Sequence, residues 1–579
     1  MKRNILLLLL LTLSLAAGAQ RRTETEAEQV ARRFLASQSR HYPRLCPALL
    51  SPRQAEQLEH LSQVRWEAAL PEGLCRPSAE GQPFYIFNDE ARGAFVIVSG
   101  DSRLRDVLGW SDEGVFGEGE LPEGLADLLS IYARQWADAE RIEEEYAYQK
   151  NLPRWGGQEV EPLLSTQWGQ GTPYNALCPS EGRGTHTPAG CVATAMAQIL
   201  KYYAYPERAN GKHSFVSRTK GYSCSFNFTA ATFDWDKMLD VYEQGSYSSA
   251  EANAVSELMY ACGVSVDMDY EMGGSGAYSD DVPYALGHFF KCNPHMSRYM
   301  RDYFPPEDFD SLLYTELEAR RPVLFCGARN DSAGHAYVID GVDGAGLYHF
   351  NWGWSGARDG YYALDVQHPY DSRHYDFFHE AICRIAPEPI GDLEQLFYLD
   401  TFSVERPVIA WGDTLRADLT TIMCANANLT HIDSSLYWEG LYGVGLYDEQ
   451  GRFVCWADIP DELQTNYDLL YYCWYMIVFP PDVCLPGTRW SLKPCALPAG
   501  EEVPVTMHTL HALTDSIPVY VASDSIYVGV IPEEVTSVRF PQESSALRQA
   551  EGIFDLQGRR LREGSRGIVV SKGKKILVR

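Results

Sequence analysis

The chain has 579 residues, of which 45% are hydrophobic and 22% are charged, and its formal net charge is −29. This length exceeds what a single hydrophobic core supports, so several domains are expected. The acidic balance argues against nucleic acid as a partner, because phosphate binding needs a basic surface. We interpret the acidity as a property that keeps an exported protein in solution.

Residues 1–19 have the three parts of a secretory signal peptide. Lys2 and Arg3 form the basic start, residues 5–15 form the apolar run, and residues 17–19 are small, as a cleavage site requires. No later stretch approaches about 18 uninterrupted apolar residues, so no membrane span is expected. The sequence therefore predicts an exported, soluble protein.

Residues 20–155 are predicted to form a small α+β domain. The stretch 21–36 is amphipathic and has acidic residues in its first turn, as a helix would. Strand-like runs follow at 84–88 and 94–99, and residues 125–148 are again helical. A proline- and glycine-containing linker then leads to the next domain. This is the layout of an enzyme with an inhibitory pro-segment, and an unrelated N-terminal domain is the alternative.

The most informative stretch is 190–205, GCVATAMAQILKYYAY, in which apolar residues recur at helical spacing. Gly190 lies in a turn before this helix, and Pro206 ends the pattern. Cys191 is therefore expected in the first turn, where free backbone N–H groups and the helix dipole favour a thiolate. Taken alone, a cysteine in an apolar helix is more often a small core residue.

Partners for the thiol follow 144 and 160 residues later, as His335 in GHAYVIDG and Asn351 in HFNWGWSG. An imidazole can take the thiol proton, and an asparagine behind the ring can fix its orientation. Gln170, in WGQGTPYN, can help the Cys191 backbone N–H to stabilise an oxyanion. Each residue alone has an ordinary structural explanation, but their order and spacing fit the papain-type arrangement.

These motifs lie in a predicted catalytic domain at 156–387, in which a helical half packs beside an antiparallel sheet. A helix is expected at 250–262. The glycine-rich loop 270–278 lacks the spacing and the lysine of a phosphate-binding loop, so it is a candidate wall of the cleft. Strand patterns separated by glycine-rich turns are found at 323–326, 336–340, 347–351 and 361–364.

Residues 388–545 contain many short strand-like runs, including 404–409 and 516–521, and predict an all-β accessory domain such as a sandwich. Residues 546–579 are basic and contain two strand-like segments around a glycine-rich middle.

Fourteen cysteines in an exported chain permit disulfides. The best candidates for bridges are clustered in the accessory domain: Cys424, Cys455, Cys473, Cys484 and Cys495. No CxxC motif occurs and the spacings do not resemble zinc sites, so no metal and no other cofactor is expected.

Several segments together resemble the streptopain family of papain-like cysteine peptidases, including related enzymes of Bacteroidetes. They are AGCVATAMAQILKYYAYP, GQGTPYN, the VDMDY–GSGA region, GHAYVIDG and HFNWGWSG. Upstream, FVIVSGDSRLRDVLGWSDEGVF is similar to the family's pro-segment. The resemblance implies a papain-like fold and a secreted endopeptidase that is made as a zymogen. Such an enzyme hydrolyses proteins or peptides through a Cys–His pair and an acyl-enzyme, and its own pro-segment inhibits it.

The resemblance also implies individual roles. Cys191 would be the nucleophile, His335 the general base and acid, and Gln170 the oxyanion donor. The papain-type asparagine role would fall on Asn351, while the adjacent Trp352 would pack close to the histidine. Substrate would be bound by Gly334 and by the loop residues Gly274, Ser275 and Gly276. A hydrophobic side chain would be preferred at the second residue before the scissile bond.

The final segments IFDLQGRR and KGKKILVR resemble the C-terminal sorting domains of type IX secretion. A terminal hairpin of the accessory domain is the alternative. Two other interpretations of the whole chain remain: an amidase that acts on cell-wall peptides, and a non-catalytic surface adhesin on a papain-like scaffold. The presence of all four candidate site residues argues against the adhesin.

Overall fold

The chain divides into two compact units, Met1–Met296 with Pro306–Ile390, and Ser297–Pro305 with Gly391–Arg579. The computed structural model describes residues 21–37, 62–63, 82–90, 93–117, 121–137, 157–182, 184–301, 306–329, 334–364, 377–391, 397–424, 438–465, 469–509, 516–529, 553–554, 560–561, 567–571 and 574–578. The predicted signal peptide at 1–19 and most of the predicted linker lie outside these residues.

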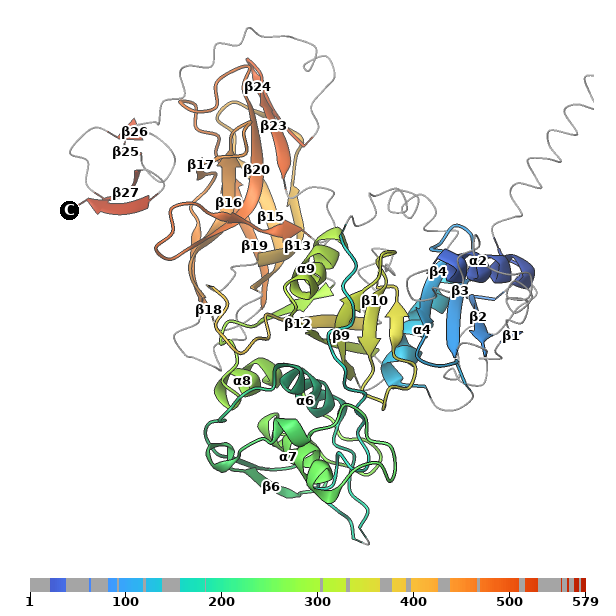
Figure 1. The fold of residues 1–579 in the computed structure, drawn as a ribbon. Helices are drawn as coiled ribbons and strands as arrows, with labels where there is room; N and C mark the ends of the chain where they lie inside the picture. The colour runs from blue at the N-terminus through green and yellow to red at the C-terminus, as the bar shows by residue number, and fades with distance from the viewer. Residues whose placement is uncertain are drawn as a thin grey trace, which may run out of the picture. The chain divides into compact units, whose positions relative to one another are not determined.

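The first unit begins with the N-terminal segment (residues 21–137), which is α+β as predicted (Figure 1). Its elements are α2 (Glu24–Ser37), β1 (Ser62–Gln63), β2 (Phe84–Asp89), β3 (Ala94–Ser99), β4 (Val107–Ser111) and α4 (Glu123–Ala137). Thr23 is the cap of α2. Its backbone N–H donates to Glu26 Oε2 (2.8 Å), and the Glu26 N–H donates to Thr23 Oγ1 (3.4 Å). This reciprocal capping box explains why the helix begins there.

The predicted catalytic domain (156–387, here called the catalytic region) follows, and it has a helical half and a sheet half (Figure 1). The helices are α6 (Cys191–Tyr203), α7 (Ser249–Ser265), α8 (Asp281–His288) and α9 (Pro306–Glu318), with short 3-10 turns η1 (Phe228–Ala230) and η2 (Trp235–Lys237). The hairpin β5 (His213–Val216) and β6 (Ser223–Phe226) lies in the helical half. The helices predicted at 190–205 and 250–262 are thus confirmed as α6 and α7.

The helix α6 is more deeply buried than its apolar stripe predicted. Every residue from Val192 to Leu200 is buried, including the polar Thr194 and Gln198. The helix packs against both α7 and the strand β9 (His335–Val342), so its polar side faces protein rather than solvent. A helix enclosed in this way must satisfy its polar side chains internally.

One antiparallel sheet joins the N-terminal segment to the catalytic region. Its strands run in the order β1-β2-β3-β4-β11-β10-β9-β8-β12, and the catalytic ones are β8 (Val323–Arg329), β9 (His335–Val342), β10 (Tyr348–Asn351), β11 (Gly360–Tyr362) and β12 (Phe377–Cys383). The four strands predicted from residue 323 onward are confirmed. The junction is β4 against β11, with Gly109 opposite Tyr362. A Cβ on Gly109 would lie 2.6 Å from Tyr362 Cδ1, so glycine permits this pairing.

The second unit is built from strands, and its part from Gly391 onward is all-β, as predicted for the accessory domain, whereas β7 falls within the range predicted as catalytic. They are β7 (Ser297–Met300), β13 (Phe397–Val404), β14 (Val408–Ala410), β15 (Leu415–Cys424), β16 (Trp438–Tyr447), β17 (Phe453–Trp456), β18 (Asp461–Thr465), β19 (Leu469–Ile477), β20 (Arg489–Pro498), β21 (Val505–Thr506), β22 (His508–Thr509), β23 (Ile517–Val521) and β24 (Ser525–Val528). One sheet has the order β19-β15-β13-β22 and another β14-β24-β23-β20-β16-β17. Both contribute to one hydrophobic cluster, for example through Leu419 and Val444, as in a β-sandwich.

Two expectations for this unit need correction. The run 404–409 is not one strand, because β13 ends at Val404 and β14 begins at Val408 in the other sheet. Pro407 lies between them and cannot donate a ladder hydrogen bond. The two segments predicted at the end of the chain form four short strands, β25 (Ile553–Phe554), β26 (Arg560–Leu561), β27 (Gly567–Ser571) and β28 (Lys574–Val578).

The disulfides expected in the accessory domain are also absent from the described residues. Cys455, Cys473, Cys484 and Cys495 all have free thiols, and the side chain of Cys424 is not described. Cys473 lies on β19 in one sheet, whereas Cys455 and Cys495 lie on β17 and β20, which flank β16 in the other. Two strand spacings, about 9–10 Å, exceed the usual Cα separation of a disulfide.

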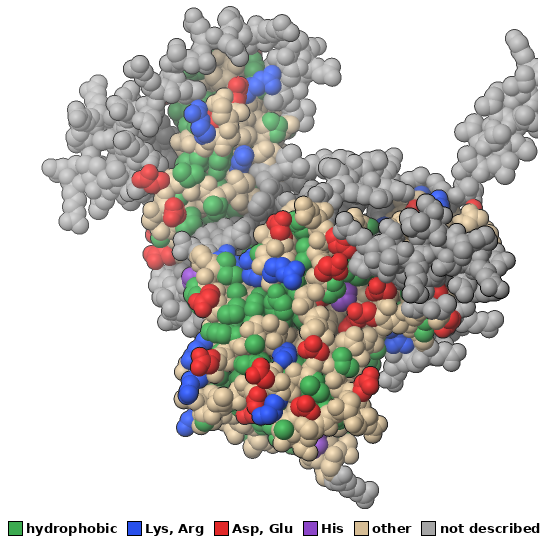
Figure 2. All heavy atoms as spheres, viewed as in Figure 1, with side chains coloured by type: hydrophobic (Ala, Val, Ile, Leu, Met, Phe, Trp, Pro, Cys, Tyr) green, Lys and Arg blue, Asp and Glu red, His purple; other side chains and the backbone are tan. Residues whose placement is uncertain are grey.

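The surface carries both signs of charge. On the face of the molecule shown in Figure 2, acidic and basic side chains are interspersed. None of the helices in the described part of the chain has the length and apolar character to cross a membrane.

Candidate active site

Cys191 is the first residue of α6, and the geometry of its turn depends on Gly190. This glycine has φ 93°, and a Cβ there would lie 2.6 Å from both Met268 Sδ and Met268 Cε. Its carbonyl accepts hydrogen bonds from the Thr194 N–H and the Thr194 hydroxyl, both at 3.0 Å. The turn therefore presents a partly exposed thiol at the N-terminal end of a buried helix, as the sequence predicted.

His335 is the first residue of β9 and is only 2% exposed. Burial raises the pKa of the Cys191 thiol, but the charge of His335 and hydrogen bonds to the thiolate from His335 and the Ala336 backbone together outweigh it, so the pKa lies below its ordinary value. Burial lowers the pKa of the imidazole, but the Cys191 thiolate and a nearby carboxylate, that of Glu123, together reverse this, so the pKa of His335 lies above its ordinary value. The two side chains therefore favour a thiolate–imidazolium pair.

The two ring nitrogens of His335 face different groups. Nε2 lies 3.3 Å from the backbone carbonyl oxygen of Trp352. Nδ1 has no hydrogen-bond partner among the described residues, so it is the nitrogen available to the thiol. This arrangement differs from the papain-type expectation, because a main-chain carbonyl and not the Asn351 side chain contacts the ring.

Asn351 instead supports the loop that carries this carbonyl. Its Oδ1 accepts from the Gly353 N–H (3.1 Å) and from Gln198 Nε2 (2.9 Å), and its Nδ2 donates to the Thr166 carbonyl (2.7 Å). All of these groups are buried. Asn351 is therefore one step removed from the imidazole.

Trp352 is completely buried and held at three points. Its backbone N–H donates to Asp359 Oδ1 (2.9 Å), and its indole N–H donates to the Arg358 carbonyl (3.0 Å). Its ring packs at 4.8 Å, between centroids, from both Tyr337 and Phe350. These contacts fix the residue whose carbonyl faces His335.

Gln170 is half-buried and lies beside the approach to α6. Its carbonyl accepts from the Ala189 N–H (2.9 Å), two residues before Cys191. Two residues earlier in the chain, the Trp168 carbonyl accepts from the Ser355 N–H (3.0 Å). The segment that carries Gln170 is thus bonded both to the chain that leads into Cys191 and to the loop that follows Trp352.

The residues predicted to bind substrate lie around the same turn. The Ser275 hydroxyl donates to the Pro188 carbonyl (2.7 Å), which fixes the loop 270–278 beside Gly190. Gly274 and Gly276 are exposed on this loop, and Gly334 is exposed immediately before His335. The structure therefore brings all nine predicted site residues into one region of the catalytic domain.

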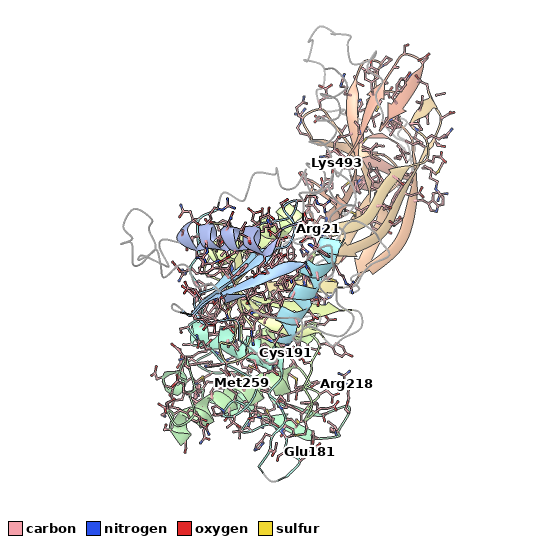
Figure 3. The ribbon with its side chains drawn as sticks, turned by 90° about the vertical axis from the view of Figure 1, so that its right-hand side faces the viewer. Arg21, Glu181, Cys191, Arg218, Met259 and Lys493 are labelled. Atoms are coloured by element: carbon pink, nitrogen blue, oxygen red, sulfur yellow. The ribbon has the colours of Figure 1, made fainter. Side chains whose placement is uncertain are left out.

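The sequence analysis missed one neighbour of the site that belongs to the N-terminal segment. Glu123, the first residue of α4, has Oε2 3.5 Å from His335 Nδ1, and its side chain is 68% exposed. Contact with His335 holds the pKa of this carboxyl below its ordinary value. Figure 3 shows the end of α4 near the labelled Cys191. No signal could have identified Glu123, because acids are common in any first helical turn.

Comparisons with known proteins agree with this geometry. The model of the peptidase C10 family matches residues 168–362, and that of the Spi protease inhibitor family matches residues 19–136. Streptopain from Streptococcus pyogenes is 34% identical over 307 residues, which cover 50% of this chain and 75% of streptopain. The thiol protease/hemagglutinin PrtT of Porphyromonas gingivalis is 32% identical, covering 49% of this chain and 34% of PrtT.

Two solved structures are also similar. A prointerpain A fragment from Prevotella intermedia is 30% identical, with a TM-score of 0.47, and covers 57% of this chain and 100% of the fragment. Active interpain A from the same organism is 37% identical, with a TM-score of 0.36, and covers 39% of this chain and 95% of that structure. The extent of the identity to streptopain, together with the family match over the Cys191 and His335 region, shows that the chain belongs to the peptidase C10 family and is a streptopain-like cysteine endopeptidase.

Proposed function

We propose that this chain is an exported cysteine endopeptidase made as a zymogen, in which Cys191 and His335 carry out catalysis and the N-terminal segment inhibits it. The observation that carries the catalytic part is the pairing of Cys191, at the start of α6, with the buried imidazole of His335, at the start of β9, which shifts the pKa of each side chain towards its charged form. Nothing in the structure favours the amidase or the adhesin.

In the proposed reaction, the Cys191 thiolate attacks the carbonyl carbon of the scissile bond. The developing oxyanion receives hydrogen bonds from the Gln170 side chain and from the Cys191 backbone N–H, which has no partner within its helix. His335 then donates its Nδ1 proton to the leaving amine. In the second half, the same nitrogen takes a proton from water, which attacks the thioester and releases the acid.

The proposed inhibition depends on how the N-terminal segment packs against the catalytic region. The Trp110 ring stacks on Tyr361 with centroids 4.8 Å apart, and its indole N–H donates to Asp343 Oδ2 (2.9 Å). The Ser111 hydroxyl donates to the Asp359 carbonyl (2.6 Å). These contacts accompany the β4–β11 pairing, so the segment extends the catalytic sheet.

The first turn of α4 lies where a leaving group would have to approach. A Cβ on Gly124 would lie 2.8 Å from Trp352 Cζ3 and 3.1 Å from His335 Cδ2, so the helix backbone is in close contact with the site. Beside it, Glu123 lies on the Nδ1 side of the imidazole. The helix therefore covers the nitrogen that must exchange protons with substrate, which supports an inhibitory role.

The decisive test uses the full-length chain with Cys191→Ala. We expect no hydrolysis of casein, no self-processing, and accumulation of the precursor at full length. Added active enzyme should then trim this precursor near the predicted boundary at 155. Proteolysis by the variant would contradict the catalytic assignment, and full activity of uncut wild-type chain would contradict the zymogen.

The remaining parts of the proposal concern domains and export. We propose the boundaries 1–19, 20–155, 156–387, 388–545 and 546–579 for the signal peptide, inhibitory domain, catalytic domain, accessory domain and sorting-like segment. Deletion of 551–579 should leave peptidase activity unchanged but retain the protein in the periplasm. Unaltered secretion of the deletion would remove the sorting role.

We also propose that proteins or peptides with a hydrophobic side chain at the second residue before the scissile bond are the preferred substrates. The exposed residues Gly274 and Gly276, on the loop that packs beside Gly190, would face this part of the substrate. A panel of peptides that varies only that position tests the preference, and equal kcat/KM for charged and hydrophobic residues would contradict it.

A further inference from the structure

Gln198 is a buried amide side chain on α6. Its hydrogen bonds connect the helix that carries Cys191 to the loop beside His335 and to the segment that carries Gln170. It lies seven residues after Cys191, two helical turns along the same side of α6, and is 0% exposed. Burying an amide without partners is costly, so a glutamine at this position needs a complete set of hydrogen bonds.

The hydrogen bonds of Gln198 reach two distant segments of the chain. Its Nε2 donates to Asn351 Oδ1 (2.9 Å), across 153 positions of sequence. Its Oε1 accepts from the Thr166 hydroxyl (2.9 Å) and from the Trp168 N–H (3.2 Å). One side chain on the Cys191 helix therefore holds both the Asn351 loop and the segment that leads to Gln170.

The connection continues to His335 through a single peptide unit. Asn351 Oδ1, which Gln198 holds, also accepts from the Gly353 N–H. That N–H and the Trp352 carbonyl belong to the same planar peptide group, so fixing one direction fixes the other. The carbonyl in turn faces His335 Nε2 at 3.3 Å. The orientation of the imidazole therefore depends on the amide of Gln198.

The other branch of the network reaches the oxyanion side. Trp168 is two residues before Gln170, and its backbone N–H donates to Gln198 Oε1. The Gln170 carbonyl is then bonded to the Ala189 N–H, close to Cys191. Rotation of the Gln198 side chain would loosen this segment and the Trp352 loop together.

We propose that Gln198 is a positioning residue. It fixes the Trp352 carbonyl, and through it His335, relative to the Cys191 helix and the Gln170 segment. This inference rests on the proposed roles of Cys191 and His335. It predicts that loss of the amide impairs proton transfer and thiolate formation more than it impairs substrate binding.

The test compares Gln198→Leu with Ile199→Val, a neighbouring substitution in the same buried helix that removes only packing. For Gln198→Leu we expect kcat of the self-processed enzyme to fall by on the order of 10² with little change in KM, because small misplacements of catalytic groups have effects of this size. The rate at which iodoacetamide alkylates Cys191 in the full-length chain can be followed across pH by mass spectrometry. The midpoint of its rise with pH should shift to higher pH. Ile199→Val should lower Tm without either change.

A milder variant keeps the test decisive where Gln198→Leu fails to fold. Thr166→Val removes a single hydrogen bond to Gln198 Oε1 and should shift the alkylation profile in the same direction by less. Wild-type kcat and a wild-type alkylation profile in the folded variants would overturn the role of Gln198. Activity in the Cys191→Ala control would instead overturn the catalytic proposal itself, so the two failures are distinguishable.

Discussion

The two sides of His335 are held by different kinds of contact. On the Nε2 side, the Trp352 carbonyl belongs to a network of buried groups, in which Asn351 and Gln198 have all their hydrogen bonds at 2.7–3.2 Å. On the Nδ1 side, which also faces the Cys191 thiol, a 3.5 Å ion pair joins the ring to Glu123, whose side chain is largely exposed.

This difference separates contacts that stay in the mature enzyme from a contact that is lost with the N-terminal segment. A fully satisfied buried network is rigid, because each lost partner leaves a costly unpaired group. The Glu123 contact has one buried partner and one largely exposed partner, so solvent and salt weaken it compared with the buried network. The hydrogen bonds of Asn351 and Gln198 on the Nε2 side all come from the catalytic region, whereas Glu123 belongs to the N-terminal segment that we propose is removed. The geometry therefore suits a site that is assembled before activation and uncovered by it.

The most severe change removes the ring that both sides hold. In His335→Ala we expect kcat/KM to fall nearly as far as in Cys191→Ala, by at least about 10⁴, because the two side chains act as one unit. The measurement is hydrolysis of a peptide substrate by chains processed in trans, with folding checked by Tm. A His335→Ala enzyme that kept a tenth of its activity would mean that the thiolate forms without the imidazole.

A second change leaves both sides of the ring intact and removes only the oxyanion donor. Gln170→Ala should lower kcat by on the order of 10²–10³, as for oxyanion donors elsewhere. The pH profile of Cys191 alkylation should stay at its wild-type position, since the thiol and the imidazole are untouched. A shift of that profile would show that Gln170 acts on the dyad and not on the oxyanion.

The parts of this site that the sequence could predict are those with a short-range pattern. The stripe of α6, the turn at Gly190 and the strand-like runs between glycine-rich turns from residue 323 identify their own elements. Cys191, His335 and Gln170 could be selected because a nucleophile, a base and an oxyanion donor are needed together for acyl transfer. The pairing of β4 with β11 was not predictable, because strand partners distant in sequence depend on which edges meet.

The supporting residues were hidden for a different reason. Gln198 could have been noticed as a polar residue seven positions from Cys191 on an apolar helix, but its partners lie 30 and 153 positions away. Asp359 lies in an Asp-Gly pair that is typical of a turn. Asn351 was assigned to the imidazole because its spacing fitted, and spacing alone does not distinguish a side chain from the adjacent main-chain carbonyl.

A third change weakens the Nε2 side without removing the ring. Asn351→Ala deletes the acceptor of the Gly353 N–H, so the Trp352 carbonyl loses its fixed direction. We expect kcat to fall about 10–10²-fold, with the acid limb of the pH profile shifted upward and KM nearly unchanged. Asn351→Asp is the matched variant, because it keeps the Oδ1 acceptor and should be less impaired.

Two outcomes would contradict this explanation of Asn351. A folded Asn351→Ala enzyme as inactive as His335→Ala would require a more direct role. A fully active one would mean that Asp359 and the packing of the Trp352 ring suffice to hold the carbonyl.

A fourth change opens the Nδ1 side by steric pressure. The Gly124 position has no room for a side chain, and Gly124→Val would push α4 away from Trp352 and His335. Self-processing of the full-length chain should become several-fold faster, because overpacking a tight contact typically costs about 1–3 kcal/mol. Gly117, which has open space around it and no positive φ, provides a matched glycine control in the same segment as Gly117→Val. Unchanged processing by Gly124→Val would mean that this contact does not limit activation.

The smallest expected effect comes from the charge on the Nδ1 side. The pKa of Glu123 is lowered, so its attraction for His335 is present above the ordinary value of 4.5 and is lost as pH falls below it. The pKa of His335 is raised, so its positive charge is present at acidic pH and persists through neutrality. The pair is therefore charged at neutral pH and fails only on acidification. The comparison needs chains that keep Cys191, because its thiolate is the main cause that raises the pKa of His335 against burial. In a short exchange pulse on freshly purified full-length chain, Glu123→Gln should reduce the hydrogen-exchange protection of α4 less than about fivefold at pH 7, since the Glu123 side chain is largely exposed. After correction for intrinsic exchange, the protection of the two chains should converge as pH falls from 5 towards 3. A difference that stayed constant over this range would mean that Glu123 acts through its shape and not through its charge.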